Sequence, residues 1–230
     1  MGAALVLPIA AAAQTEARPG PAAQTEAPPG PWAIDVRAVT GSLPQDPSFF
    51  PPLPTGAPLP SAHLGFDIGG HFYRFRLGPA RLGLGVNLLR VGGEASLRVP
   101  TPTGTSPPPR PRLPSVETRV RMFTPQLSFN FGSSRGWSYL SAGVGQIAVS
   151  TATSEFASGS SATSPLTPAQ TRETAALQTI NFGGGARWFN TEHLAFSFDV
   201  RFHKAAGRTK EGVSTVPATL VTASAGLSLK

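Results

Sequence analysis

The side chains best suited to bind a metal or to act as a general base are the four histidines. A zinc site needs three or four such ligands close together. His71 and His203 each lie on the polar face of a predicted β-strand, but they are on different strands and near opposite ends. His63 is expected in a loop and His193 in a turn. The chain has no cysteine, which excludes thiolate ligands, disulfides and a cysteine nucleophile. We expect no metal site and no cofactor.

A serine–histidine pair is the other chemistry to consider, because hydrolases and acyltransferases that act on lipid use it. Serines are abundant, but no spacing to a histidine singles one out. Gly184 and Gly185 open no helix, so they do not form a phosphate-binding loop. We therefore expect that the protein is not an enzyme. The alternative is an outer-membrane enzyme that modifies lipid.

Ionised side chains also stand at alternating positions in segments whose opposite face is apolar. Three are acidic and three are basic, so their charges balance. Because an isolated buried charge is costly, we expect ion pairs between neighbouring strands: Arg37 with Asp67, and Arg187 with Asp199. If the strands close into a barrel, as argued below, these pairs would plug its lumen. The alternative is that the charges lie near the rims of the barrel, in contact with water. The predicted interior network is Asp35, Arg37, Asp67, Arg187, Asp199 and Arg201.

The elements that position these groups alternate with a period of two, which is typical of β-strands. In His193 to His203, bulky apolar residues occupy one face, and small, polar or charged residues occupy the other. Each such segment is near the 9–11 residues with which a tilted strand crosses a bilayer. The predicted strands lie within residues 32–41, 65–73, 82–89, 123–131, 139–145, 180–188, 193–203 and 221–230.

The connections between these segments alternate in length, as in an up-and-down outer-membrane barrel with its long loops outside. The long ones cover about 42–64, 92–122 and 148–179, and 204–217 is intermediate. We expect no regular structure over most of Pro44–Pro60 and Pro100–Pro114, because proline donates no backbone hydrogen bond. The turns expected in the periplasm, on the side of the mature N-terminus, are Leu77–Ala80, Gly132–Gly136 and Asn190–His193.

Two features favour lipid over water outside this barrel. The polar faces carry small glycines, which let a narrow barrel close, with ionised groups among them. Aromatic residues near the tight turns match a girdle at a membrane interface. The predicted girdle is Phe75, Phe131, Trp137, Tyr139, Trp188 and Phe189.

The segments Gly183–His203, Pro125–Gly132 and Trp137–Gly145 resemble the OmpA-type outer membrane protein β-barrel families. The resemblance covers nearly all of 32–230 and implies an eight-stranded barrel, but it says little about function. Members of these families often end in an aromatic residue, whereas this chain ends in Leu229-Lys230.

The N-terminal residues are expected to lie outside the barrel. Residues 1–13 contain an apolar run that ends in alanines, as a signal peptide does. Residues 14–31 belong to a duplicated Pro/Ala/Gly-rich stretch, AAQTEARPGP followed by AAQTEAPPGP, which predicts a flexible linker.

Composition narrows the function classes further. Of the 230 residues, 40% are hydrophobic, which is too many for a wholly disordered chain. The net charge of +7 either is solvated or contacts anionic lipopolysaccharide, and no nucleic-acid-binding module is present. The basic residues assigned to loops are Arg98, Arg110, Arg112, Arg119, Arg121, Arg172, Lys204, Arg208 and Lys210.

The sequence thus predicts an all-β protein, an eight-stranded antiparallel up-and-down transmembrane β-barrel in a bacterial outer membrane. We expect a monomer in contact with outer-membrane lipid and lipopolysaccharide, with a structural or surface-interaction role and no nucleic-acid partner. The main alternative is a narrow channel for small solutes or ions. A wide pore is excluded, because side chains fill an eight-stranded interior.

Overall fold

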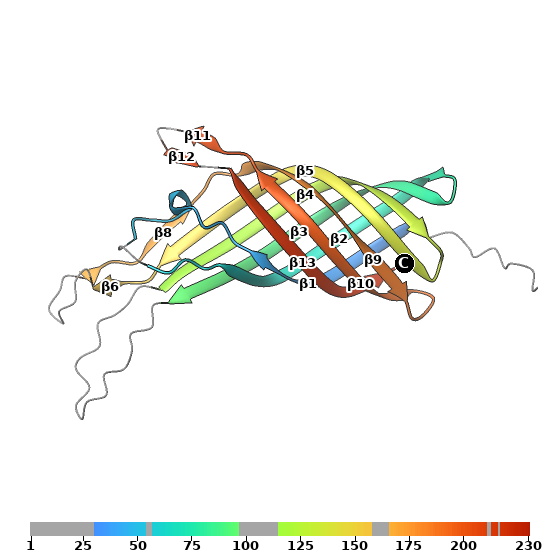
Figure 1. Ribbon diagram of the computed structural model, residues 1–230, viewed down its shortest axis with the longest axis horizontal. Helices are drawn as coiled ribbons and strands as arrows, with labels where there is room; N and C mark the ends of the chain where they lie inside the picture. The colour runs from blue at the N-terminus through green and yellow to red at the C-terminus, as the bar shows by residue number, and fades with distance from the viewer. Residues whose placement is uncertain (1–29, 54–56, 97–114, 158–165, 211–212, 216) are drawn as a thin grey trace, which may run out of the picture.

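The computed structural model describes residues 30–53, 57–96, 115–157, 166–210, 213–215 and 217–230. Eight long strands form one closed antiparallel barrel, in which each strand pairs with the next and β1 pairs with β13 (Figure 1). The predicted eight-stranded up-and-down fold is therefore confirmed. The strands are β1 (Trp32–Ser42), β2 (Ala62–Leu77), β3 (Ala80–Ser96), β4 (Ser115–Gly132), β5 (Gly136–Thr153), β9 (Leu177–Phe189), β10 (Leu194–Ala205) and β13 (Ala218–Leu229).

Three tight turns lie at one end of the barrel, which we call the turn end (right in Figure 1). β1 begins and β13 ends there as well, since Ile34 pairs with Leu229. Gly78, between β2 and β3, has φ of 61°, a left-handed conformation that glycine adopts without the steric cost of a side chain. The predicted turns are confirmed, and they join Leu77 to Ala80, Gly132 to Gly136 and Phe189 to Leu194.

The opposite end, the loop end, carries the long connections, and short elements occur within them (Figure 1). β8 extends the barrel wall by pairing with the end of β5. Two small hairpins, β6–β7 and β11–β12, lie beyond the wall. The short elements are η1 (Pro47–Phe49), β6 (Phe156–Ala157), β7 (Leu166–Thr167), β8 (Gln170–Glu173), β11 (Arg208–Lys210) and β12 (Val213–Thr215).

In the described part of Pro44–Pro60 the three-residue 3-10 turn η1 is the only regular element, as predicted, and Phe49 and Phe50 are buried there. Other predicted placements need correction. His63 lies in β2 rather than in a loop, because β2 begins three residues before the predicted segment. Arg119 and Arg121 lie in β4, and Lys204 lies in β10. The predictions for Pro100–Pro114, for the signal segment 1–13 and for linker residues 14–29 fall outside the described residues.

Part-way along the barrel, the strand face that carries the polar side chains changes from the inner face to the outer face. On β4, Gln126 is buried inside and Leu127 is exposed outside in the half near the turn end, whereas Val120 is buried inside and Arg121 is exposed outside near the loop end. Successive side chains of a strand point to opposite faces, so one strand can serve both arrangements. The half near the turn end therefore has a polar interior and an apolar exterior, and the other half has the reverse.

In the described part of the chain, no helix is long and apolar enough to cross a membrane.

Candidate functional site

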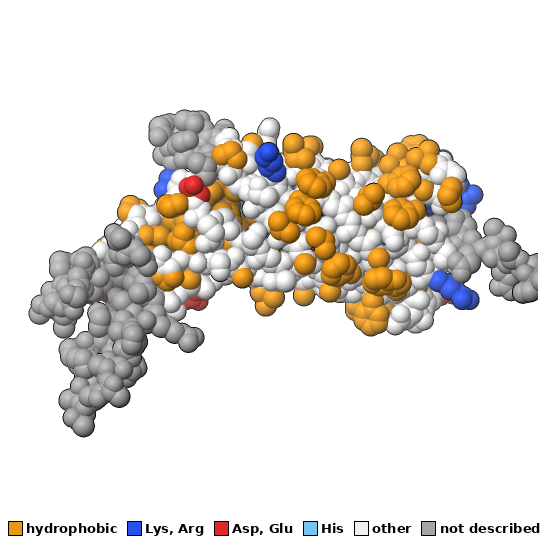
Figure 2. All heavy atoms as spheres, viewed as in Figure 1, with side chains coloured by type: hydrophobic (Ala, Val, Ile, Leu, Met, Phe, Trp, Pro, Cys, Tyr) orange, Lys and Arg blue, Asp and Glu red, His pale blue; other side chains and the backbone are white. Residues whose placement is uncertain are grey.

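All eight long strands contribute exposed apolar side chains to the outer wall near the turn end, and Figure 2 shows many apolar side chains on the face in view. Leu84 is 65% exposed and Leu140 is 59% exposed, which would be costly in water. On β4 this surface extends from Phe123 to Phe131, about 27 Å along the strand. With a tilt near 45° that is about 20 Å of depth, close to the apolar band of outer-membrane barrels. We call this surface the lipid belt.

The lipid belt ends in outward polar side chains on the loop-end side. On two adjacent strands these are Arg90 and Arg121, which lie directly opposite each other. The lipid belt and its polar border are those of a transmembrane barrel, as predicted. The outward residues at the border are Arg90, Arg121, Gln146, Gln178 and Lys204.

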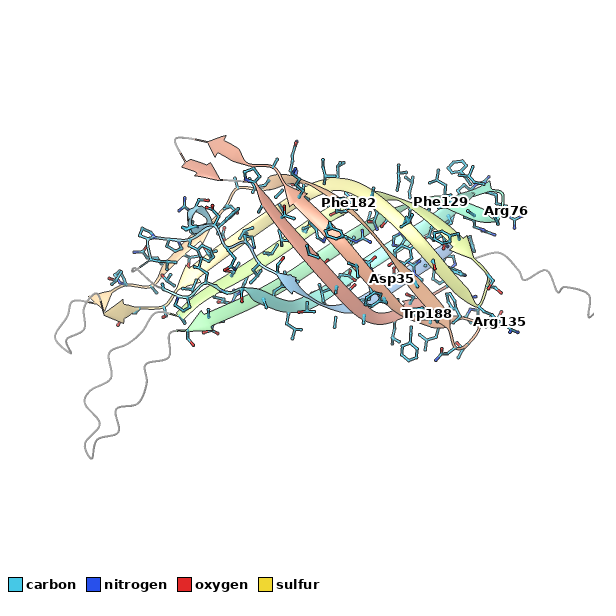
Figure 3. The ribbon with its side chains drawn as sticks, viewed as in Figure 1. Asp35, Arg76, Phe129, Arg135, Phe182 and Trp188 are labelled. Carbon is cyan, nitrogen blue, oxygen red and sulfur yellow. The ribbon has the colours of Figure 1, made fainter. Side chains whose placement is uncertain are left out.

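The aromatic girdle is confirmed only in part. Trp137 and Tyr139 are each 1% exposed and point into the barrel, because both positions share the inward phase of β5. Phe189 is half-buried and packs against Trp137, with 4.9 Å between ring centroids. Of the six predicted aromatics, those that face outward near the turn end are Phe75, Phe131 and Trp188, the last labelled in Figure 3.

The six predicted charged residues are all buried in the polar half of the interior. The closest ion pair among these six residues joins Arg187 of β9 to Asp35 of β1 across the lumen. Its guanidinium donates through Nε and Nη2 to the two carboxylate oxygens at 2.8 and 2.6 Å. Asp35 also accepts a hydrogen bond from the Ser228 hydroxyl. A bidentate pair of this kind is the strongest form of side-chain hydrogen bonding between arginine and a carboxylate.

The predicted pairing of Arg187 with Asp199 is wrong. On the β9–β10 ladder Arg187 lies opposite Ser197, and its long side chain reaches across the barrel to Asp35 instead. Asp199 pairs with Arg201, two residues along the same face of β10, at 2.9 and 3.1 Å. The closer partner on the same strand thus takes the place of the partner on the neighbouring strand.

The predicted pair of Arg37 and Asp67 is present between β1 and β2. Arg37 Nε and Nη2 donate to the Asp67 carboxylate at 2.9 and 3.2 Å. The Tyr139 hydroxyl links this pair to the next one, because it accepts from Arg37 Nη1 at 2.6 Å and donates to Asp199 at 2.7 Å. The ion pairs therefore form one connected layer across the barrel.

Uncharged residues complete the layer, and sequence reasoning did not identify them as part of the network. The Tyr139 ring lies 4.1 Å from the Arg187 guanidinium carbon. Tyr73 contacts Arg187 Nη1 at 3.4 Å through its hydroxyl and stacks on His71, with 5.9 Å between centroids. Arg201 donates to the Gln126 side chain. All of these positions share the inward phase of their strands, which is the signal that could have found them.

The interior beyond this layer, toward the loop end, is filled by an apolar cluster that we call the mouth cluster. Phe49 and Phe50, from the connection between β1 and β2, are 1% and 2% exposed within it. The Thr151 hydroxyl donates to the Phe49 carbonyl at 2.7 Å, and Arg172 Nη1 donates to the Phe50 carbonyl at 2.9 Å. The mouth cluster comprises Val39, Leu43, Phe49, Phe50, Leu89, Val91, Val116, Val120, Met122, Ile147, Val149, Leu177, Ala205, Ala218 and Leu220.

The histidines do not assemble a reactive centre. Within the described ranges, no group of three or more His, Asp or Glu side chains is arranged to hold a metal ion. His203 Nε2 lies 3.2 Å from the Thr222 hydroxyl, but both side chains are buried inside the barrel and a membrane lipid cannot reach them. This contact gives no support to the enzymatic alternative.

Comparisons with known proteins find similarity only among solved structures. No family model matches the chain, and no curated protein matches it. The attachment invasion locus protein Ail of Yersinia pestis, solved with the heparin analogue sucrose octasulfate, is 11% identical, with 86% of this chain and 96% of that chain covered and a TM-score of 0.46. Neisserial surface protein A is 11% identical over 87% and 97%, with a TM-score of 0.48.

The outer membrane protease OmpT from Escherichia coli is 12% identical over 74% of this chain and 64% of that chain, with a TM-score of 0.47. These similarities concern the fold alone. The chain resembles small outer-membrane β-barrels in its architecture, as the sequence predicted.

Proposed function

We propose that the protein is a non-conducting outer-membrane barrel with a structural or surface-interaction role exerted at its loop end. The observation that carries this proposal is the double filling of the interior. Side chains of the ion-pair layer cross the lumen near the turn end, and the mouth cluster fills the lumen near the loop end. A solute would have to displace both.

The charge layer favours closure over conduction. A conducting lumen needs charges that face water, whereas Arg37, Arg187 and Asp35 have side chains that are 0% exposed and are held in bidentate pairs. Opening a path would break pairs whose removal costs several kcal/mol each. The narrow-channel alternative is therefore the less favoured one, and a current measurement separates the two.

Because the lipid belt faces the membrane and the lumen is filled, the loop end is the surface that we propose for interaction with other molecules. β3, β4 and β5 continue past the lipid belt by several residues, and their outer faces there carry charges such as Arg119 and Glu117, paired at 2.6 Å. An apolar interior supports this extension from within, so it forms a rigid platform for the long connections. Outer-membrane lipid, including lipopolysaccharide, is the partner that we expect around it, and the barrel itself is expected to be monomeric.

Membrane fractionation combined with gel mobility tests the placement. We expect the protein in the outer-membrane fraction, and we expect unboiled samples to migrate at a different apparent mass from boiled samples because the closed barrel resists unfolding in detergent. Recovery in the soluble fraction, or identical mobility before and after boiling, would contradict the proposal.

A further inference from the structure

A hollow interrupts the lipid belt along the seam of β5 and β9. It has a volume of about 710 Å³ and is lined mainly by apolar side chains. Part of its floor is Ala142, a small outward residue that leaves space between larger neighbours. Gly184 also lines the hollow, and the Leu140 side chain packs over it. The walls of the hollow include Leu127, Leu140 and Phe182, the last labelled in Figure 3.

A second hollow of about 650 Å³ continues the first toward the loop end, and it adjoins a break in the sheet. Ala142 and Val144 are successive outward residues of β5, which places the two hollows end to end. The β4–β5 ladder pairs Phe123 with Gln146 and resumes only at Gln126 with Gly143, so it is interrupted at Pro125. Proline cannot donate to a ladder and is unusual inside a sheet, and here it lines the hollow.

The upper end of this groove is polar. Gln146 and Gln178 lie opposite each other on β5 and β9 and line both the second hollow and a third one of about 370 Å³, which reaches Ala206 and Gly207. Two exposed cations flank the amides. Arg121 lies opposite Ala148 on one side, and Lys204 lies opposite Ile180 on the other.

The dimensions of the groove suit one hydrocarbon chain. From Leu140 to Gln146 the groove follows about 20 Å of strand, which is about 14 Å of depth at a tilt near 45° and matches one leaflet of a hydrocarbon core about 30 Å thick. The polar end lies at the loop-end border of the lipid belt, which is the outer leaflet in the proposed orientation.

We propose that this groove binds one phosphorylated glycolipid of the lipid A type from the outer leaflet. One acyl chain lies over Ala142 and Val144, the Gln146 and Gln178 amides hydrogen bond to sugar hydroxyl and amide groups, and Arg121 and Lys204 neutralise the phosphates. Paired amides favour a sugar headgroup over a simple phosphodiester, because they need hydroxyl or amide partners as well as charge. This inference rests on the proposed outer-membrane placement of the barrel.

Lipid retention measured by native mass spectrometry tests the site. The folded protein is placed in nanodiscs of phosphatidylcholine that contain a few per cent of bisphosphorylated lipid A, dephosphorylated lipid A or phosphatidylglycerol. The protein is then released from the nanodisc, and the lipid molecules that stay bound to it are counted by mass. Ala142→Leu fills the floor of the groove, and Ala225→Leu is its matched control, because Ala225 is also outward and exposed but lies on β13. Arg121→Gln with Lys204→Gln removes the cations, and Arg76→Gln at the turn end is the control (Figure 3).

We expect the wild-type protein to retain one bisphosphorylated lipid A molecule. Retention should fall by about tenfold or more, equivalent to about 1.4 kcal/mol, in Ala142→Leu and in the double cation variant, and should remain unchanged in both controls. Equal loss in Ala142→Leu and Ala225→Leu, equal retention of phosphatidylglycerol, or retention of no lipid would each overturn the proposal. All variants are first checked for heat-modifiable mobility, so a folded barrel that retains no lipid refutes the groove and leaves the proposed function standing.

Discussion

Replacing Arg187 with methionine tests the ion-pair layer directly. Methionine retains much of the side-chain volume of arginine but removes the charge and both hydrogen bonds to Asp35, at 2.8 and 2.6 Å. Both side chains are 0% exposed, so water cannot take over the role of the guanidinium. The Asp35 carboxylate would keep the Ser228 hydroxyl, His71 at 3.5 Å and Arg37 at 3.9 Å.

The expected cost follows from these remaining contacts. Removing one partner of a buried ion pair destabilises a protein by about 3–5 kcal/mol. Because Asp35 retains partial compensation, we expect a loss near the lower limit, about 3 kcal/mol in the free energy of unfolding. The double variant Asp35→Asn/Arg187→Met should recover part of this loss, since it leaves no unpaired carboxylate.

Urea unfolding in lipid vesicles, followed by tryptophan fluorescence, measures the effect. Trp137 lies 6.0 Å from the Arg187 guanidinium carbon and reports on this region. Arg76→Met is the control, because Arg76 is exposed at the turn end and its loss should change stability by less than about 0.5 kcal/mol. Two results together would contradict a buried, coupled ion pair. Arg187→Met would be as stable as the wild type, and the double variant Asp35→Asn/Arg187→Met would be less stable than Arg187→Met.

Four further outcomes are expected. Tyr139→Phe removes the hydroxyl that joins two ion pairs, so urea unfolding should show a loss of about 1–3 kcal/mol. Phe49→Ala empties part of the mouth cluster, and the same assay should show a loss of about 3–5 kcal/mol; a neutral result would mean that Phe49 does not pack there in solution. Leu127→Arg, in the lipid belt, should lower the free energy of unfolding by about 2–4 kcal/mol, whereas Ala148→Arg, on the loop-end side of the belt, should lower it by no more than about 1 kcal/mol. Equal losses would show that the lipid belt does not end where we place it. Trypsin added to intact cells should cleave after Arg112 in the β3–β4 connection, and cleavage confined to the turn end would reverse the orientation.

The strands and turns could be predicted from the sequence because they depend on local patterns. The alternation in 193–203 fixes which residues of β10 face outward, and the spacing around Gly78 and Pro79 fixes a tight turn. The same parity placed all six charged residues inside the barrel. These properties need only the period of two and the lengths of the connections.

Contacts across the lumen could not be predicted, because they depend on the stagger and diameter of the closed barrel. Arg187 reaches Asp35, 152 residues away in sequence, rather than a partner on the adjacent strand. The mouth cluster was also missed, because strand alternation alone does not show that Phe49 and Phe50 fold back into the barrel. Residue type alone suggests Trp137 and Tyr139 for the girdle, whereas the inward phase that they share on β5 places them inside the barrel.

The closed interior is the central claim, and the ionic current through the folded protein in a planar bilayer tests it most directly. Folding of the same preparation is verified beforehand by heat-modifiable mobility. We predict no steady current above that of the lipid alone, because the ion-pair layer and the mouth cluster together occupy the lumen. Reproducible, ohmic single-channel steps from the wild-type protein would contradict the account and establish the narrow channel instead.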